Sequence, residues 1–394
     1  MRRKLLLLIT FVLLFILPVV GSFIETGGFP NGYGLFPAQE VNKNAPFNPI
    51  YFGVGCMIAL VITTFLVFPT IFGFKKSLVP PKTPKPAVGY PKWFRPALII
   101  VVISWIFMWG RFEGAKPLDH FTFVPLWWGF IFVLDGIVYK RNGGSSLFSS
   151  KKGRVTMKLM AVTSSFSWFV FEFQNFFVLE NWYYPNNMVF TNFGNIAWQL
   201  LSYTTVLPAI FEWYWLLRTF DGLNRKYTQG PVIKFPVKIL YAFLFAGLLL
   251  SLFMAIFPQE LFWALWIGLI PALAPAMMIS KFWNPFTPIG TRGDWSPVVL
   301  VAVATLLNGF FWEFWNFGSE LFHDKWPTNP NYWRYSVPYF DKIHIFSAMP
   351  ILGYFGYLFF GIGCWLLWNT IAHLAGFSPA VHDQDQTEEL TAQA

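Results

Sequence analysis

The sequence contains one chemical pattern twice: an acidic residue followed three positions later by an amide, within an aromatic stretch. The first copy contains Glu172 and Asn175, and the second contains Glu313 and Asn316. A spacing of three places the acid and the amide on one face of a helix. A carboxylate inside a bilayer is costly unless it is paired, protonated or facing water. The two pairs are therefore the leading candidates for a functional site.

Three interpretations of these pairs stay open. Each pair can be a purely structural contact that hydrogen-bonds a neighbouring helix, an interaction worth about 0.6–2 kcal/mol. Alternatively, at least one acid belongs to a binding or catalytic site, in which a protonated Glu172 or Glu313 would serve as a general acid. The third interpretation is contact with lipid headgroups alone.

Tryptophans accompany both pairs. Trp168 and Trp312 lie beside the acids, and Trp182 and Trp333 lie in the polar segments that follow. Tryptophan is enriched where helices leave the membrane, so an aromatic belt accounts for many of these residues. Their density beside the acids leaves room for a groove that holds a flat or isoprenoid-like ligand. The predicted ligand-binding residues are Glu172, Asn175, Glu313, Asn316, Trp168, Trp312, Trp182 and Trp333.

Three histidines give a weak metal signal. Glu320 and His323 are spaced by three, as are Asp341 and His344, and His120 follows an aspartate. On a helix this spacing would let both side chains of a pair reach one metal ion. A di-iron site needs more carboxylates than these segments contain, so no metal centre is predicted. Motifs for nucleotide binding or for zinc or serine hydrolases are missing from the sequence, and the cofactor stays unknown.

Two further acids lie near basic residues in the sequence. Lys140 and Arg141 follow Asp135, and Arg218 follows Glu212. Near a membrane interface, such charges mostly serve packing and topology, and the alternative is an ion or proton path.

The composition identifies a membrane protein. Of the 394 residues, 55% are hydrophobic and only 12% are charged, whereas soluble proteins have about 25% charged residues. The formal charge of +9 arises mostly from short loops between apolar segments, so nucleic acid is not a predicted partner. Cys56 and Cys364 fall in two different apolar segments, so there is no disulfide framework.

About ten transmembrane helices are predicted, because a stretch of about 18 or more apolar residues crosses a bilayer. The first is the apolar run up to Val20, for which a retained helix is favoured over a signal peptide cleaved near Gly21. The others are residues 50–74, 96–112, 121–139, 157–179, 195–217, 236–257, 259–279, 297–318 and 348–372.

Basic residues predict the orientation. They cluster in the loops at 75–95, 140–156 and 218–234, which fall on one side of the predicted topology. That side is cytoplasmic by the positive-inside rule. The chain is therefore predicted to be a multi-pass protein of the inner (plasma) membrane with a cytoplasmic C-terminus. Its acidic tail, residues 376–394, is predicted to be disordered.

Three sequence features that occur twice, at similar spacing, indicate an internal duplication. The step from Gly129 to Glu172 is 43 residues, and the step from Gly268 to Glu313 is 45. From each asparagine to the next proline in an apolar segment, the steps are 33 and 34 residues. The segment Trp-Tyr-Tyr-Pro after the first pair matches Trp-Arg-Tyr-Ser-Val-Pro after the second.

The predicted fold is all-α and polytopic, with two parallel four-helix repeats. The repeats comprise residues 96–235 and 236–375, and two further helices lie in residues 1–95. Because each repeat has an even number of spans, both enter the membrane from the same side. The symmetry axis is therefore expected to run along the membrane normal.

Residues 171–185, 312–317 and 349–360 resemble a family of uncharacterised bacterial multi-pass membrane proteins. The resemblance covers most of residues 96–372 and implies a helical membrane fold. It implies no activity, substrate or cofactor.

These observations favour a protein that binds or moves a hydrophobic or amphipathic molecule, lipid-like or isoprenoid-like, at its outward side. One alternative is a membrane enzyme that acts on a lipid or isoprenoid by acid-base chemistry. Another is a structural or assembly subunit of a membrane complex. Membrane lipids are the predicted partners, and the oligomeric state is left open.

Overall fold

The computed structural model describes residues 2–76, 85–116, 118–320 and 326–381, whose regular secondary structure is almost entirely helical. Among these residues, six helical segments are long and apolar enough to cross a membrane. They are α1 (Arg2–Thr26), α2 (Pro49–Val67), α4 (Phe123–Arg141), α9 (Val237–Ile256), α13 (Ser296–Glu320) and α14 (Gly356–Ala375), the last preceded by the 3-10 turn η5 (Ile351–Phe355). The predicted all-helical, multi-pass membrane fold is confirmed to this extent. The acidic tail from residue 382 lies outside the described residues.

The other four predicted spans are not long, regular apolar helices. One of them corresponds to α3 (Phe94–Gly110), which is apolar but short. Another corresponds to α5 (Lys151–Asn175), which is long but begins in the basic segment before the predicted span. The remaining two are broken. Residues 195–217 form α6 (Asn192–Tyr203) and α7 (Val206–Arg218), and residues 259–279 form α10 (Ala264–Ile267) and α11 (Leu269–Ile279). The number of ten spans therefore stays a prediction.

Prolines account for both breaks. A proline has no N–H to donate to the carbonyl four residues earlier, so a helix tends to be interrupted there. Four positions before Pro208 is Thr204, which lies between α6 and α7, and four before Pro271 is Ile267, the last residue of α10. Hydropathy does not detect these breaks, because the sequence on both sides of each is apolar.

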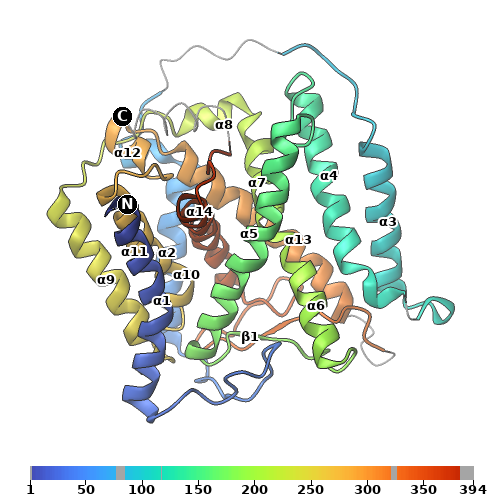
Figure 1. The fold of residues 1–394 in the computed structure, drawn as a ribbon, viewed down its shortest axis with the longest axis horizontal. Helices are drawn as coiled ribbons and strands as arrows, with labels where there is room; N and C mark the ends of the chain where they lie inside the picture. Colours follow the sequence, from blue (N-terminus) through green and yellow to red (C-terminus); the bar gives the residue numbers. More distant parts are fainter. Residues whose placement is uncertain (1, 77–84, 117, 321–325, 382–394) are drawn as a thin grey trace.

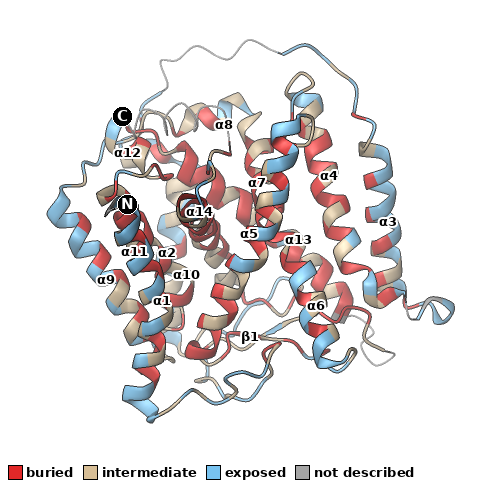
Figure 2. Ribbon diagram, viewed as in Figure 1, coloured by how far each residue is buried: buried red, intermediate tan, exposed pale blue. Residues whose placement is uncertain are grey.

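The outer helices expose apolar side chains. Only 6% of the most apolar stretch of α2 is buried, against 67% for α13 and for α14. Ile50, Met57 and Leu60 on α2 are each more than half exposed. Figure 2 shows exposed residues along α3 and α9 as well, whereas α13 and α14 are mostly buried. A continuous exposed apolar surface of this kind is typical of helices that face lipid.

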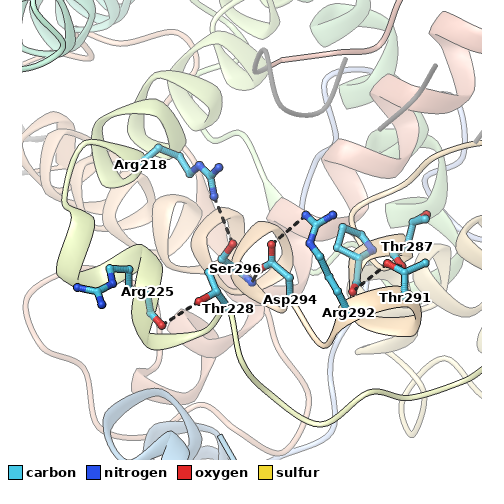
Figure 3. Close-up of polar contacts among 9 residues, drawn as sticks. Arg218, Arg225, Thr228, Thr287, Thr291, Arg292, Asp294 and Ser296 are labelled. Carbon is cyan, nitrogen blue, oxygen red and sulfur yellow. Dashed lines mark hydrogen bonds and ion pairs between the residues drawn. The ribbon is translucent and has the colours of Figure 1, made fainter. Parts of the chain in front are cut away.

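The central helices bring the two acid-bearing segments together. Both α5, which carries Glu172, and α13, which carries Glu313, pack against α7 and α14. At one end of the bundle, Arg218 of α7 donates to the Ser296 hydroxyl at the start of α13 at 3.2 Å (Figure 3). The Ser296 N–H donates to Asp294 at 2.9 Å, and Asp294 also pairs with Arg292 at 3.1 Å.

The two ends of the bundle differ in structure. The hairpin between α4 and α5, the short helix α8 (Asp221–Lys226) and α12 (Thr287–Arg292) all lie at one end (Figure 1). The opposite end contains the antiparallel strands β1 (Trp182–Tyr183) and β2 (Arg334–Tyr335), in which Trp182 is paired with Tyr335. β1 follows α5 in the sequence and β2 follows α13, so their pairing holds together the two segments that come after the Glu/Asn pairs.

Candidate functional site

Glu172 is buried on α5, with 1% of its surface exposed, among four hydrogen-bond donors. Its Oε1 atom accepts all four bonds: from the Tyr184 hydroxyl at 2.5 Å, the Trp168 indole at 2.7 Å, the Tyr203 hydroxyl at 3.0 Å and the Trp182 indole at 3.2 Å. Its Oε2 atom is buried and accepts no hydrogen bond from the described residues. One oxygen of this carboxyl group therefore organises the surrounding aromatic side chains.

Glu313 occupies a similar position on α13 and is fully buried. Its Oε1 atom accepts from the hydroxyls of Tyr357 at 2.6 Å and Tyr335 at 2.7 Å, and its Oε2 atom accepts from the Ser347 hydroxyl at 2.9 Å. The Trp333 indole donates to the Tyr335 hydroxyl at 2.8 Å. Both oxygens of Glu313 are thus used, which differs from the arrangement at Glu172.

The two amides hold the segments that supply these donors. Asn175 donates to the carbonyl of Trp182 at 2.9 Å. Asn316 donates to the carbonyl of Trp333 at 2.7 Å and accepts from the Trp333 N–H at 3.1 Å. Asn175 therefore holds the backbone of Trp182, the first residue of β1, and Asn316 holds the backbone of Trp333, which directly precedes β2. The pairing of the two strands then holds these segments against each other.

A cavity lies between the two glutamate clusters. Its empty volume is about 760 Å³, including the open mouth. Five tryptophans line it: Trp168, Trp182, Trp266, Trp312 and Trp333. The tyrosines that donate to the two carboxyl groups, Tyr184, Tyr203, Tyr335 and Tyr357, are also on its wall. The glutamates lie behind these side chains and do not line the cavity themselves.

The structure thus places the four predicted tryptophans on one cavity wall. The predicted acids and amides do not line the cavity but hydrogen-bond residues that do. Sequence reasoning missed the four tyrosines, Trp266 and Gln199, which is also on the wall. A signal existed for Tyr184 and Tyr335, because both belong to the repeated segment that begins with tryptophan. Tyr203 and Tyr357 gave none, since they lie 31 and 44 residues from their glutamates.

The loop tyrosines are held in their protonated form. Burial, and then the negative charge of Glu172, raises the pKa of Tyr184 well above its ordinary value. Burial and the charge of Glu313 do the same to the pKa of Tyr335. Both phenols therefore act as hydrogen-bond donors to the acids over the whole physiological pH range.

A third buried acid lies in the loop after α5. Burial raises the pKa of Glu180 to about 7; the Val41 N–H opposes this shift and the charge of Glu172 adds to it. The segment before α2 packs directly on this side chain, because a Cβ atom added at Gly32 would lie 2.9 Å from a Glu180 carboxyl oxygen. The Tyr184 N–H donates to the carbonyl of Ala38 in the same segment at 2.9 Å.

The stability of the protein is expected to depend on the ionisation of Glu180. Between the ordinary carboxyl pKa and the raised one, Glu180 is protonated in the folded state but has lost its proton in the unfolded state. Stability therefore falls as the pH rises through this range. Between about pH 5 and about pH 8, the melting temperature of the wild type should fall relative to that of Glu180→Gln. Thermal unfolding of both proteins in detergent across this range checks the prediction. A difference in melting temperature that does not change with pH would contradict it.

Asp135 and Glu212 are paired with each other, which differs from the expectation based on the nearby basic residues. Both are fully buried, Asp135 on α4 and Glu212 on α7, and because these helices pack together the two carboxyl groups interact. Asp135 also accepts from the Phe148 N–H and the Ser146 hydroxyl, both at 2.9 Å. Two carboxyl groups in contact need a shared proton. We expect Glu212 to carry this proton, because both oxygens of Asp135 already accept a hydrogen bond.

Substitutions at this pair should therefore have unequal effects. Glu212→Gln keeps a donor toward Asp135, so the free energy of unfolding should change by less than about 1 kcal/mol. Asp135→Asn replaces one acceptor oxygen by a donor and should cost about 1–3 kcal/mol, because a buried donor is left unpaired. Denaturation of the two variants in detergent measures the difference. Greater damage from Glu212→Gln would show that Asp135 is the protonated partner.

The histidines do not form a metal centre within the described residues, where no three metal-ligating side chains come together. His120 lies 3.7 Å from Asp119, and His344 lies 3.1 Å from Asp341. His323 lies outside the described residues.

No protein-family model, curated protein or solved structure matches the chain. The resemblance to bacterial multi-pass membrane proteins therefore stays a prediction. The fold and the site together define an all-helical, multi-pass membrane protein with an aromatic cavity between two buried glutamates.

Proposed function

We propose that the protein binds a hydrophobic or amphipathic molecule, lipid-like or isoprenoid-like, in the cavity between the Glu172 and Glu313 clusters. The observation that supports this most is the wall of the cavity, which combines five tryptophan rings with a few polar groups. Binding sites for small molecules are typically concave and mostly apolar, with a few polar groups that orient the ligand. A flat, unsaturated chain would lie against the indole faces, because stacked aromatic and π systems attract each other.

The position of the cavity favours a ligand taken from the outer side of the membrane. Trp182 and Tyr335, which are paired across β1 and β2, both line it, so the cavity lies toward the strand end of the bundle. Lys140 and Arg141 at the end of α4, and Arg225 and Lys226 in α8, lie at the opposite end. By the positive-inside rule the basic end faces the cytoplasm of a plasma-membrane protein. The strand end and the cavity would then be outward.

We also infer that the cavity lies between two halves that arose by duplication. Two kinds of contact support this. In each cluster the asparagine donates to the carbonyl of the tryptophan that follows it, and the tyrosine two residues after that tryptophan donates to the glutamate. The helix contacts also correspond: α3 packs on α4 as α9 packs on α11, and α5 packs on α7 as α13 packs on α14. A shared site between related halves is a common arrangement in membrane transporters.

Acid-base catalysis on the bound molecule is the second candidate function. It is favoured by the contact of each buried carboxyl group with tyrosine hydroxyls on the cavity wall. A protonated glutamate could pass a proton through the bridging tyrosine hydroxyl to a carbon–carbon double bond, whose π electrons form the new C–H bond, and it would become a carboxylate. Loss of a proton from a carbon next to the cation would form a new double bond and return the carboxylate to its acid form. Tryptophan faces would stabilise the resulting carbocation, since cations are attracted to aromatic rings.

Titration of the purified protein in detergent with all-trans-retinol, a fluorescent polyene alcohol, tests the binding function. Energy transfer from tryptophan to retinol should saturate near one equivalent and should be reversed by geranylgeraniol, a non-fluorescent isoprenoid. Transfer that rises without saturation would mean partition into detergent and would contradict the proposal. Mass analysis of geranylgeraniol after incubation separates the two functions, because a changed product favours the enzyme and unchanged alcohol favours binding alone.

A further inference from the structure

One polar group on the cavity wall has no partner. Gln199 lies on α6 and is 1% exposed, and its side-chain oxygen is buried without a hydrogen bond from any described residue. Leaving a buried acceptor unpaired costs about 1–3 kcal/mol, so such a group in a cavity wall indicates a missing donor. No other side chain that lines the cavity has a buried, unpaired oxygen or nitrogen among the described residues.

The neighbouring polar side chains satisfy one another. The Ser202 hydroxyl donates to the Trp198 carbonyl at 2.8 Å and accepts a short hydrogen bond from Asn331. The Thr205 hydroxyl donates to the Ser202 carbonyl at 2.6 Å. These side chains line the same cavity as Gln199, and their bonds hold this part of the wall in place. Gln199 therefore brings an unpaired acceptor to a wall on which the other buried polar side chains are satisfied.

We propose that Gln199 binds the hydroxyl end of the ligand, so that the cavity selects an alcohol with a long apolar body. This inference rests on the proposed binding function and makes it more specific. The hydroxyl would donate to the Gln199 oxygen, while the chain lies against the tryptophans. A hydrocarbon or an ether of the same shape would leave the oxygen unpaired. A site built to bond a hydroxyl discriminates strongly against an analogue that lacks it.

A matched pair of probes tests the proposal. All-trans-retinol and its methyl ether carry the same polyene, but only the alcohol has a donor. Wild-type protein should bind retinol about tenfold more tightly than the ether, which is the effect of one buried hydrogen bond. Gln199→Met keeps the length of the side chain and removes the acceptor, so the two affinities should become about equal while the affinity for the ether stays the same.

Gln174→Met provides the control, because Gln174 is also buried but does not line the cavity. It should leave the ratio of the two affinities unchanged. Equal affinities for alcohol and ether in the wild type would overturn the role of Gln199 while leaving the binding function intact, and this comparison needs no variant. If neither probe binds saturably, the proposed binding function itself fails.

Discussion

Replacing Gly356 by leucine is expected to abolish ligand binding without destabilising the fold. Gly356 lines the cavity at the start of α14, and a Cβ atom added there would meet no atom within 4 Å. The leucine side chain would therefore extend into free space and take the place of the ligand. Its helical backbone suits leucine, which is favoured over glycine in a helix by roughly 0.5–1 kcal/mol.

Retinol affinity should fall by at least about tenfold in Gly356→Leu, equivalent to about 1.4 kcal/mol of binding energy, while the melting temperature stays equal or rises. Gly53→Leu is the matched control. Gly53 is an exposed residue of α2 that likewise has no atom within 4 Å of an added Cβ, and it does not line the cavity. Saturable binding of retinol by Gly356→Leu with wild-type affinity would place the ligand elsewhere.

Removal of the acceptor at Glu172 is expected to have the largest effect on stability. Glu172→Leu would leave four buried donors, from Trp168, Trp182, Tyr184 and Tyr203, without their shared oxygen. An unpaired buried donor costs about 1–3 kcal/mol, so the total should prevent folding or reduce the melting temperature severely. Expression level and thermal unfolding in detergent measure the loss.

Glutamine substitutions separate this structural role from a need for charge or a proton. At Glu172, glutamine can keep the bonded oxygen and place its NH₂ group where Oε2 has no partner, so it should be tolerated within about 1 kcal/mol. At Glu313 both oxygens accept bonds, so the NH₂ group would meet the Ser347 hydroxyl or the two tyrosines. We therefore expect Glu313→Gln to impair ligand binding more than Glu172→Gln. The reverse order would contradict the assigned hydrogen bonds.

Local sequence patterns predicted the supporting residues better than the cavity itself. The repeated Glu/Asn spacing located the two clusters, and the segments beginning with Trp182 and Trp333 were recognised because they follow at similar places in the two halves. The pairing of these segments as β1 and β2 could not be predicted, because each strand has only two residues. Tyr203 and Tyr357 come from helices that reach the acids only through tertiary packing.

The positions of Gln199, Asp135 and Glu212 could not be predicted from local sequence patterns. Gln199 lies in a span predicted as one apolar helix, and only the break before Pro208 separates α6, which carries Gln199, from α7. Asp135 and Glu212 were grouped with basic residues nearby in the sequence, whereas α4 and α7 pack side by side and bring the two acids into contact. In both cases the decisive contact is between distant segments.

Identification of the molecules that co-purify with the protein tests the central claim most directly. Wild-type protein, Gly53→Leu and Gly356→Leu would be purified from native membranes in mild detergent, and their organic extracts compared by mass spectrometry. The cavity should retain a specific apolar molecule, present at close to one equivalent in the wild type and in Gly53→Leu and depleted in Gly356→Leu. Extracts that contain only bulk phospholipid, in equal amounts for all three proteins, would contradict a ligand in the aromatic cavity.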